Sequence, residues 1–294
     1  MTNHFIDFDT VSSDDIRQLL SLAGDIKANP GAFSHRLSGA VLAMIFEKSS
    51  ARTRVSFEVG IQKLGGSAIS LMPSDIGMGT REPVKDVARV LSRYCDIAMI
   101  RVKNHQRISD FAAYSSIPVI NGLSDLSHPC QAMADLFTIF SYKPAVAKVA
   151  YIGDGNNVCH SLMSICDRLG VDLTVITPPG YEPTLLGTQT VLTTDLKKGL
   201  RDADVVYTDV WTSMGQEAEA EVRVRAFLEY QVNNQTLAYA NSDAIFMHCL
   251  PAVRDQEVTD DVIEGDQSVV FDQAENRMCV QQAIMIWLLE GELT

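Results

Sequence analysis

The sequence predicts an α/β fold with two domains, each built on a central parallel sheet flanked by helices. Short apolar runs of strand length alternate with helical stretches along the chain, which is the pattern of parallel sheets with crossover helices. A chain of 294 residues is also long for one hydrophobic core and typical of two domains. We expect one domain over residues 1–135, with a C-terminal helix over 275–294 packing back on it, and a second domain over residues 136–274.

The first half of the chain supplies elements of both kinds. Segment 14–23 has helical character, and the apolar run 41–46 predicts a buried strand. The helix expected over 51–64 has Ser50 at its N-cap position and ends at Gly65-Gly66. The elements that follow are a helix at 83–95, strands at 97–100 and 119–120, an Asn-Gly turn after the second strand, and a helix at 131–142.

The second half restarts the alternation. A strand at 149–152 precedes a helix from Asn157 to Leu169, which Gly170 stops. The further predicted strands lie at 173–176, 205–207, 245–247 and 269–271, and the chain ends with the helix "AENRMCVQQAIMIWLLEG".

Polar residues follow most of the predicted strands. In open α/β sheets, ligands bind beyond the carboxyl ends of the strands. We therefore expect residues that are scattered in sequence to converge in a cleft between the two domains. These residues are Ser50–Thr53, Arg101, His128, Asn156-Asn157, Asp209, His248-Cys249 and Asp272.

Composition and charge exclude several classes of partner. The content of 46% hydrophobic and 21% charged residues is that of a soluble globular protein. No stretch approaches the roughly 20 apolar residues of a membrane span, and the N-terminus lacks the features of a secretory signal. The formal net charge of −13 argues against nucleic acid and membrane surfaces as partners. We expect a cytoplasmic protein that attracts any anionic ligand with a local cluster of positive charge.

The six cysteines show no CxxC pair and no spacing typical of zinc sites, so no metal site is predicted. Free thiols in a reducing compartment follow from this pattern, and most of them are expected in the core. The cysteines are Cys95, Cys130, Cys159, Cys166, Cys249 and Cys279.

The stretch "IFEKSSARTRVSFEVG" at residues 45–60 places hydroxyls and arginines where a strand gives way to a helix. A helix N-terminus has unpaired N–H donors and partial positive charge, which suit an oxyanion such as phosphate. Positions two apart on a helix point to nearly opposite sides, so we assign Arg52 to the ligand and Arg54 to a structural or subunit contact. The alternative is a capped surface helix with solvated arginines.

Four later motifs offer further polar groups. "HPCQ" combines a possible donor to a carbonyl oxygen, His128, with the amide of Gln131, and "YIGDGNN" offers asparagines for a carboxylate. "DVWTSMG" places Asp209 where it could bind an ammonium, and "MHCLP" places a thiol and a carbonyl before a proline. The alternatives are helix capping for the histidine and asparagines, a buried structural acid and a core cysteine. "YIGDGNN" lacks the third glycine of a dinucleotide loop, so NAD binding is not expected.

The order of these motifs along one chain is more specific than any one of them. "FEKSSARTR", Arg101, "HPCQ", "GDGNN", "DVWTSMG", "HCLP" and "FDQAENR" together resemble the aspartate/ornithine carbamoyltransferase family over nearly the whole chain. "SMG" and "HCLP" are similar to the ornithine branch of that family. The resemblance implies two α/β domains, a site between them, and assembly as a homotrimer or a multiple of trimers.

The resemblance also implies a role for each motif residue. Carbamoyl phosphate would be bound by Ser50, Ala51, Arg52, Thr53, Arg101, His128, Pro129, Cys130, Gln131, Cys249, Leu250 and Arg277. Ornithine would be bound by Asn157, Asp209, Ser213 and Met214. The residues expected to act in catalysis are Arg52, Arg101, His128, Gln131 and Cys249.

The chain departs from the family pattern at three places. The family usually has threonine where this chain has Ala51, and a glutamine lent by the neighbouring subunit aligns with Gly77. The segment between "PPGYEP" and "LRDADVVYTDVW" is shorter than usual. None of these departures changes Arg52, His128 or Cys249.

The reaction that the resemblance implies is transfer of a carbamoyl group to the side-chain amine of L-ornithine, giving L-citrulline and phosphate, without a cofactor or metal. One alternative is a carbamoyltransferase for another amine, such as putrescine or an N-acylated ornithine. The other is a non-catalytic relative that binds the metabolite. The sequence leaves open whether the reaction serves arginine synthesis or breakdown.

Overall fold

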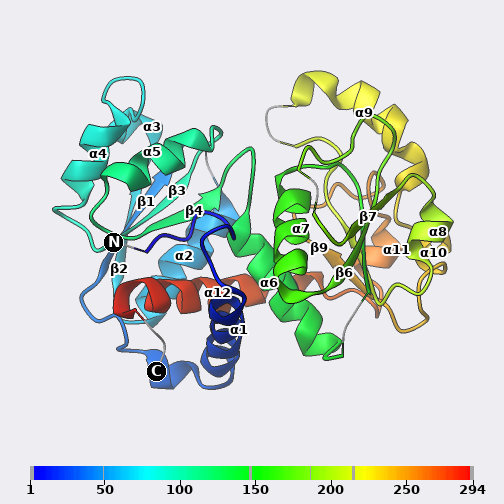
Figure 1. Ribbon diagram of the computed structural model, residues 1–294, viewed down its shortest axis with the longest axis horizontal. Helices are drawn as coiled ribbons and strands as arrows, with labels where there is room; N and C mark the ends of the chain where they lie inside the picture. The colour runs from blue at the N-terminus through cyan, green and yellow to red at the C-terminus, as the bar shows by residue number, and fades with distance from the viewer. Residues whose placement is uncertain (1–2, 49, 146–147, 186, 214–215, 292–294) are drawn as a thin grey trace. The chain divides into compact units, whose positions relative to one another are not determined.

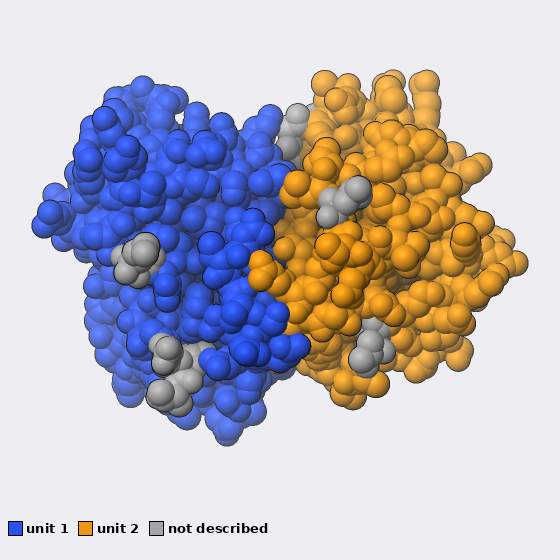
Figure 2. Space-filling model, viewed as in Figure 1, with its two compact units in different colours: residues 1–133, 276–294 blue, residues 134–275 orange. Residues whose placement is uncertain are grey.

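The computed structural model describes residues 3–48, 50–145, 148–185, 187–213 and 216–291 (Figure 1). The chain forms two compact units, coloured separately in Figure 2. Unit 1 comprises residues 1–133 and 276–294, and unit 2 comprises residues 134–275. Each unit contains one parallel sheet with helices, so the predicted fold class is confirmed.

Unit 1 is built on a four-stranded sheet in the order β2-β1-β3-β4, with every described pair parallel. Its strands are β1 (Val41–Phe46), β2 (Ser67–Leu71), β3 (Ile97–Arg101) and β4 (Val119–Leu123). Its helices are α1 (Ser13–Ala28), η1 (Pro30–Phe33), α2 (Ala51–Lys63), α3 (Pro73–Ile76), α4 (Val84–Leu91) and α5 (Gln106–Tyr114). β1 and β3 are almost continuously apolar because parallel strands are covered on both faces.

The predicted Asn-Gly turn after residue 120 is wrong, because Asn121 and Gly122 lie inside β4. A Cβ atom on Gly122 would come within 2.3 Å of the Met99 Sδ atom on the neighbouring strand. The glycine therefore allows a close approach between β3 and β4 and does not mark a turn.

Unit 2 is built on a five-stranded sheet in the order β7-β6-β5-β8-β9, with its described pairs also parallel. Its strands are β5 (Lys148–Ile152), β6 (Asp172–Ile176), β7 (Thr190–Thr193), β8 (Val205–Thr208) and β9 (Ile245–His248). Its helices are α7 (Asn157–Leu169), α8 (Leu196–Leu200), η2 (Glu217–Glu219), α9 (Ala220–Phe227), η3 (Leu228–Tyr230), α10 (Asn234–Leu237) and α11 (Asp260–Ile263). A core cluster that includes Trp211, Phe227 and Phe246 packs within this unit.

Two long helices contain the points where the chain passes from one unit to the other. α6 (Pro129–Tyr142) contains the boundary after Met133, and α12 (Val270–Glu290) contains the boundary before Asn276. The predicted strand at 269–271 is wrong, because α12 begins at Val270 and Asp272 lies in its first turn. An isolated bridge between Phe246 and Ser268 precedes the helix. Val269 and Val270 are buried, so their apolar character reflects core packing and not a strand.

The described helices include none that is both long enough and apolar enough to span a bilayer. All six cysteines are free thiols, as the sequence predicted, and five of them are buried. Cys249 is partly exposed.

Candidate functional site

The N-terminus of α2 presents the hydroxyl and arginine residues of the first motif. Ser50 occupies the N-cap position with an extended backbone, but its hydroxyl makes no capping hydrogen bond. Thr53 is buried and Arg52 is exposed. Arg54 forms an i,i+4 ion pair with Glu58 at 3.4 Å, which is a local helix-surface contact. Both arginines are exposed, and the assignment of Arg52 to the ligand stays a prediction.

Two guanidinium groups converge on the hydroxyl of Thr53. Arg101, the last residue of β3, donates from Nη1 to Thr53 Oγ1 at 2.9 Å, and Arg277 on α12 donates from Nη2 to the same oxygen at 3.2 Å. Arg277 is buried and Arg101 is partly buried. Two cations within hydrogen-bond reach of one oxygen produce a local positive potential in a chain of net charge −13.

The "HPCQ" motif forms the start of α6, where the backbone N–H of Gln131 donates to the His128 carbonyl oxygen at 3.0 Å. Burial lowers the pKa of His128 well below its ordinary value, and the positive charges of Arg277 and Arg101 lower it further. His128 is therefore a neutral imidazole near pH 7 and can donate one hydrogen bond. The Cys130 thiol points to the Asn121 carbonyl oxygen at 3.5 Å, and burial raises its pKa to about 12, so it does not supply a thiolate.

We name these unit 1 residues the cationic cluster. They come from the carboxyl ends of β1, β3 and β4 or the segments just beyond, together with α12, and they are Thr53, Arg101, His128, Gln131 and Arg277.

Unit 2 carries a second group of polar residues, centred on Asp209 one residue after β8. Asn156 donates from Nδ2 to Asp209 Oδ2 at 2.7 Å and to Ser213 Oγ at 3.4 Å. The backbone N–H of Val210 donates to Asp209 Oδ1 at 2.8 Å. Asp209 is buried, and these two donors carry no formal positive charge, so neither is a counter-ion for its carboxylate.

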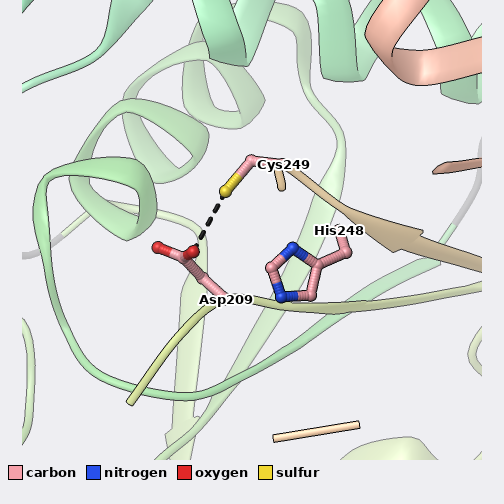
Figure 3. Close-up of side chains that lie close together, drawn as sticks. All are labelled: Asp209, His248 and Cys249. Carbon is pink, nitrogen blue, oxygen red and sulfur yellow. Dashed lines mark hydrogen bonds between the residues drawn. The ribbon is translucent and has the colours of Figure 1, made fainter. Parts of the chain in front are cut away.

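Cys249 completes this second group. Figure 3 shows its thiol directed at Asp209, where Sγ donates to Oδ1 at 3.0 Å. We name this set the acid–thiol cluster, and it consists of Asn156, Asp209, Ser213 and Cys249.

The sequence offers Asn156 among the asparagines that could hold a carboxylate, but the family resemblance assigns only Asn157 to ornithine. It caps α7, accepting N–H bonds from Val158 and Cys159 at its side-chain oxygen while its amide nitrogen reaches Asp209. Asn157, the residue chosen from the sequence, is the first residue of the helix itself. The preference for asparagine at N-cap positions could have singled out Asn156. Met214, another predicted ligand, lies outside the described residues.

Asp154 is a second acid of the same unit, and it already has a cationic partner. Arg223 donates from Nη1 to Asp154 Oδ2 at 2.9 Å, and both side chains are buried. Burial raises the pKa of Asp154, and Arg223 opposes that shift. The charge of Asp154 is thus offset within unit 2, which distinguishes it from Asp209.

The "HCLP" segment has a defined local structure. Leu250 has a φ of +58°, which non-glycine residues rarely adopt. Its backbone N–H donates to His248 Nδ1 at 2.8 Å, and His248 Nε2 lies 3.1 Å from Glu257 Oε1. The ligand atoms of Asp209, His248 and Cys249 lie within 4.8 Å of one another, but both ring nitrogens of His248 already have partners. This histidine therefore holds the Leu250 backbone by a hydrogen bond, and neither of its ring nitrogens is available as a metal ligand.

Known proteins match this chain over nearly its whole length. Residues 3–141 match the carbamoyl-P binding domain of the aspartate/ornithine carbamoyltransferases, and residues 146–288 match the Asp/Orn binding domain. An ornithine carbamoyltransferase of Wolinella succinogenes is 49% identical over 97% of this chain and 98% of its own, and that of Pyrococcus horikoshii is 53% identical over 88% and 87%. The solved ornithine carbamoyltransferase of Pyrococcus furiosus superposes with a TM-score of 0.95 at 46% identity, covering 99% of this chain and 98% of that one. The chain belongs to the aspartate/ornithine carbamoyltransferase family.

Proposed function

We propose that this chain transfers the carbamoyl group of carbamoyl phosphate to the side-chain amine of L-ornithine, giving L-citrulline and phosphate. The observation that carries the proposal is the convergence of Arg101 and Arg277 on Thr53, beside the N-terminus of α2. Relatives named ornithine carbamoyltransferase, 46–53% identical over most of the chain, support the choice of ornithine.

Carbamoyl phosphate is the ligand that suits the cationic cluster. Its phosphate would accept from the backbone N–H groups at Ala51 and Thr53 and from Arg52, which is exposed at the first turn of α2. Its carbonyl oxygen would accept from Arg101 and from the neutral imidazole of His128. Further contacts carried over from the family motif are Ser50, Pro129, Cys130, Gln131, Leu250 and Arg277.

Ornithine suits the acid–thiol cluster. Asp209 offers a carboxylate whose described donors are all neutral, so it can bind an α-ammonium. Ser213 and the N-terminal end of α7 at Asn157 offer donors for the α-carboxylate, and Met214 is carried over from the family motif. Cys249 is proposed to contact the side-chain amine.

The proposed reaction begins with attack of the neutral amine on the carbonyl carbon. A C–N bond forms and the carbonyl oxygen takes the negative charge of a tetrahedral intermediate. The C–O bond to phosphate then breaks, phosphate leaves with the electron pair, and the proton lost by the amine passes to it. The donors proposed to offset the oxyanion charge are Arg52, Thr53, Arg101 and His128. All of these groups belong to the chain or its substrates, so the proposal includes no cofactor.

We also propose a role in arginine biosynthesis, a cytoplasmic location and assembly as a homotrimer or a multiple of trimers. The six free thiols support a reducing compartment. Val55 on α2 and Ile69 on the edge strand β2 are apolar and more than half exposed, which supports burial against another copy. Gly77 has a φ of +56°, so the backbone at this position favours glycine over the glutamine that the family resemblance would place there. Location of the site in a cleft between the two domains also stays a prediction.

The proposal is tested by initial rates of carbamoyl transfer to four amines at saturating carbamoyl phosphate. We expect kcat/KM for ornithine to exceed that for putrescine, N-acetylornithine and aspartate by about a hundredfold or more, because a buried polar site that loses its partner discriminates strongly. Equal use of putrescine or N-acetylornithine would overturn the choice of ornithine. Binding of carbamoyl phosphate without turnover of any amine would indicate a non-catalytic relative.

A further inference from the structure

A buried chain of hydrogen bonds in unit 2 runs from α6 to the carboxyl ends of β8 and β9. Asp135 on α6 is fully buried and accepts two hydrogen bonds. The Tyr207 hydroxyl donates to its Oδ2 atom at 3.0 Å, and Gln273 Nε2 donates to its Oδ1 atom at 2.7 Å. Gln273 Oε1 in turn accepts the backbone N–H of His248 at 3.0 Å. All four residues are buried, so each of these bonds is costly to break.

The residues at both ends of this series of hydrogen bonds, Tyr207 and His248, are close in sequence to residues of the acid–thiol cluster. Tyr207 precedes Asp209 by two residues, and His248 directly precedes Cys249. β8 and β9 are neighbours in the sheet, with Tyr207 paired to Met247 and Thr208 to His248. Asp135 is thus tied to both strand ends that carry the acid and the thiol.

In each of these hydrogen bonds, only one of the two groups can be the donor. A backbone N–H can only donate, so the His248 N–H requires the oxygen of the Gln273 side chain to face it. The Gln273 amide nitrogen must then face Asp135, which must accept. Burial and the charge of Asp135 raise the pKa of Tyr207 well above its ordinary value, so its hydroxyl keeps the proton and donates.

We propose that Asp135 is a positioning residue that sets the separation between Asp209 and Cys249 by anchoring Tyr207 directly and His248 through Gln273. This inference rests on the proposed function, in which those two side chains bind ornithine. Asp135 touches no substrate in this proposal and acts only through the two strand ends.

A second hydrogen bond between the same two helices provides a matched control. Tyr142 on α6 donates to Asp272 Oδ2 on α12 at 2.6 Å, but both residues are exposed. No described bond of this pair reaches β8 or β9. Tyr142→Phe therefore removes a link between α6 and α12 and leaves the buried chain of Asp135 intact.

The test compares Gln273→Glu, Asp135→Asn and the double variant with the wild-type chain. Gln273→Glu places two buried carboxylates against each other. In the double variant, the amide nitrogen introduced at position 135 would donate to the new carboxylate at position 273, and the amide oxygen would accept from Tyr207. The carboxylate would still accept the backbone N–H of His248. The double variant thereby restores every hydrogen bond, with the amide now at position 135 and the carboxylate at position 273.

Two readouts are measured at one pH. The first is kcat/KM for ornithine, which is compared with KM for carbamoyl phosphate in the same variant. The second is the alkylation rate of Cys249 by iodoacetamide, located by mass spectrometry. The thiolate is the reactive form, and a carboxylate 3.0 Å away opposes its formation, so the rate reports the Asp209–Cys249 geometry. The other five cysteines are buried, which makes the labelling selective.

We expect each single variant, Gln273→Glu or Asp135→Asn, to lower kcat/KM for ornithine at least tenfold with KM for carbamoyl phosphate within twofold, and to change the alkylation rate at least threefold. The double variant should recover both values to within threefold, and Tyr142→Phe should match the wild type. An unaffected Gln273→Glu, a folded double variant without recovery, or an equal loss in Tyr142→Phe would overturn the proposal. If Gln273→Glu does not fold, Tyr207→Phe, which removes one hydroxyl, carries the same test with a smaller change.

The two proposals fail in different ways. A wild-type chain that forms no citrulline would contradict the proposed function, while the alkylation rates would still test the positioning role. An active wild type whose variants leave the alkylation rate unchanged would contradict only the positioning role.

Discussion

Unit 1 gathers cationic and hydroxyl donors at the carboxyl end of its sheet, whereas unit 2 gathers an acid, a thiol and amide groups at the carboxyl end of its own. The strand ends supply the positions in the same way in both units, because the carboxyl ends of neighbouring parallel strands meet at one edge. The electrostatics are opposite. Arg101 and Arg277 converge on a hydroxyl in unit 1, and Asp209 collects neutral donors in unit 2.

In the proposed function, the fold therefore sets the position of each ligand, and the side chains set which ligand each cluster binds. A doubly charged phosphate needs strong local donors in a chain whose net charge is −13. An amino acid with an α-ammonium needs a carboxylate. Each cluster suits one substrate of the proposed reaction, so variants of the two clusters should affect different kinetic constants.

The largest expected effect comes from Arg52→Ala. Loss of one donor to a developing oxyanion typically costs about 10²–10³ in rate, and Arg52 is proposed to serve both phosphate and carbonyl. Arg54→Ala is the matched control, since it removes only the exposed pair with Glu58, which is worth about 0.5 kcal/mol or less. Steady-state rates of both folded variants check this. Near-normal citrulline formation by Arg52→Ala would remove that arginine from the site.

Asp209→Asn should lower kcat/KM for ornithine by about a hundredfold, because the α-ammonium loses its charged partner. The asparagine keeps the shape and can still accept from the Asn156 amide. The loss should be much smaller for N-acetylornithine, which has no α-ammonium. Initial rates of the variant with both amines check this, and an equal loss for both would show that Asp209 does not bind the α-ammonium.

The low pKa of His128 predicts a dependence of stability on pH. Below pH 6.5 the unfolded chain binds a proton at this residue, whereas the folded chain, with its lowered pKa, does not. The contribution of His128 to the free energy of unfolding is therefore fully present above about pH 6.5. Below that pH the free energy of unfolding falls by up to about 1.4 kcal/mol per pH unit because of this residue. Urea unfolding between pH 7 and pH 5 measures this slope. His128→Asn should show a shallower slope than the wild type, and an identical slope would be evidence that the folded histidine also takes up the proton.

The smallest expected effect is that of Ala51→Thr, which introduces the residue usual in the family. The backbone N–H at position 51 is present with either side chain, and backbone donors carry much of a helix-terminus site. The KM for carbamoyl phosphate should change less than threefold. A tenfold gain, equivalent to about 1.4 kcal/mol, would show that the missing hydroxyl matters.

Strands and helices with strong apolar patterns were predictable from the sequence. β1 and α7 have the predicted bounds or nearly so, because a continuous apolar run and a capped amphipathic stretch are local signals. The residues around Val270 were misassigned because valine favours strands locally while core packing selects a helix here. The edge strand β7 was missed, since Val191 and Leu192 are partly or largely exposed and give no buried alternation.

The candidate site also contains residues that local sequence patterns indicate and residues that they do not. Arg52 and Asp209 could be proposed as ligands from the sequence because they follow predicted strands. The contact between Arg277 and Thr53 joins residues 224 positions apart, so no local pattern could place it. Asp135 and Gln273 gave no signal at all, because a buried polar pair becomes visible only when the packing of the surrounding residues is known.

The central claim is that the cationic cluster binds carbamoyl phosphate and the acid–thiol cluster binds ornithine. It is tested most directly by equilibrium binding of carbamoyl phosphate, measured by calorimetry in the absence of ornithine. Arg101→Gln and Asp209→Asn each remove one charge, one from each cluster. We predict that Arg101→Gln weakens binding at least tenfold, or about 1.4 kcal/mol, and that Asp209→Asn stays within twofold of the wild type. Equal losses in the two folded variants, or unchanged binding by Arg101→Gln, would contradict the account.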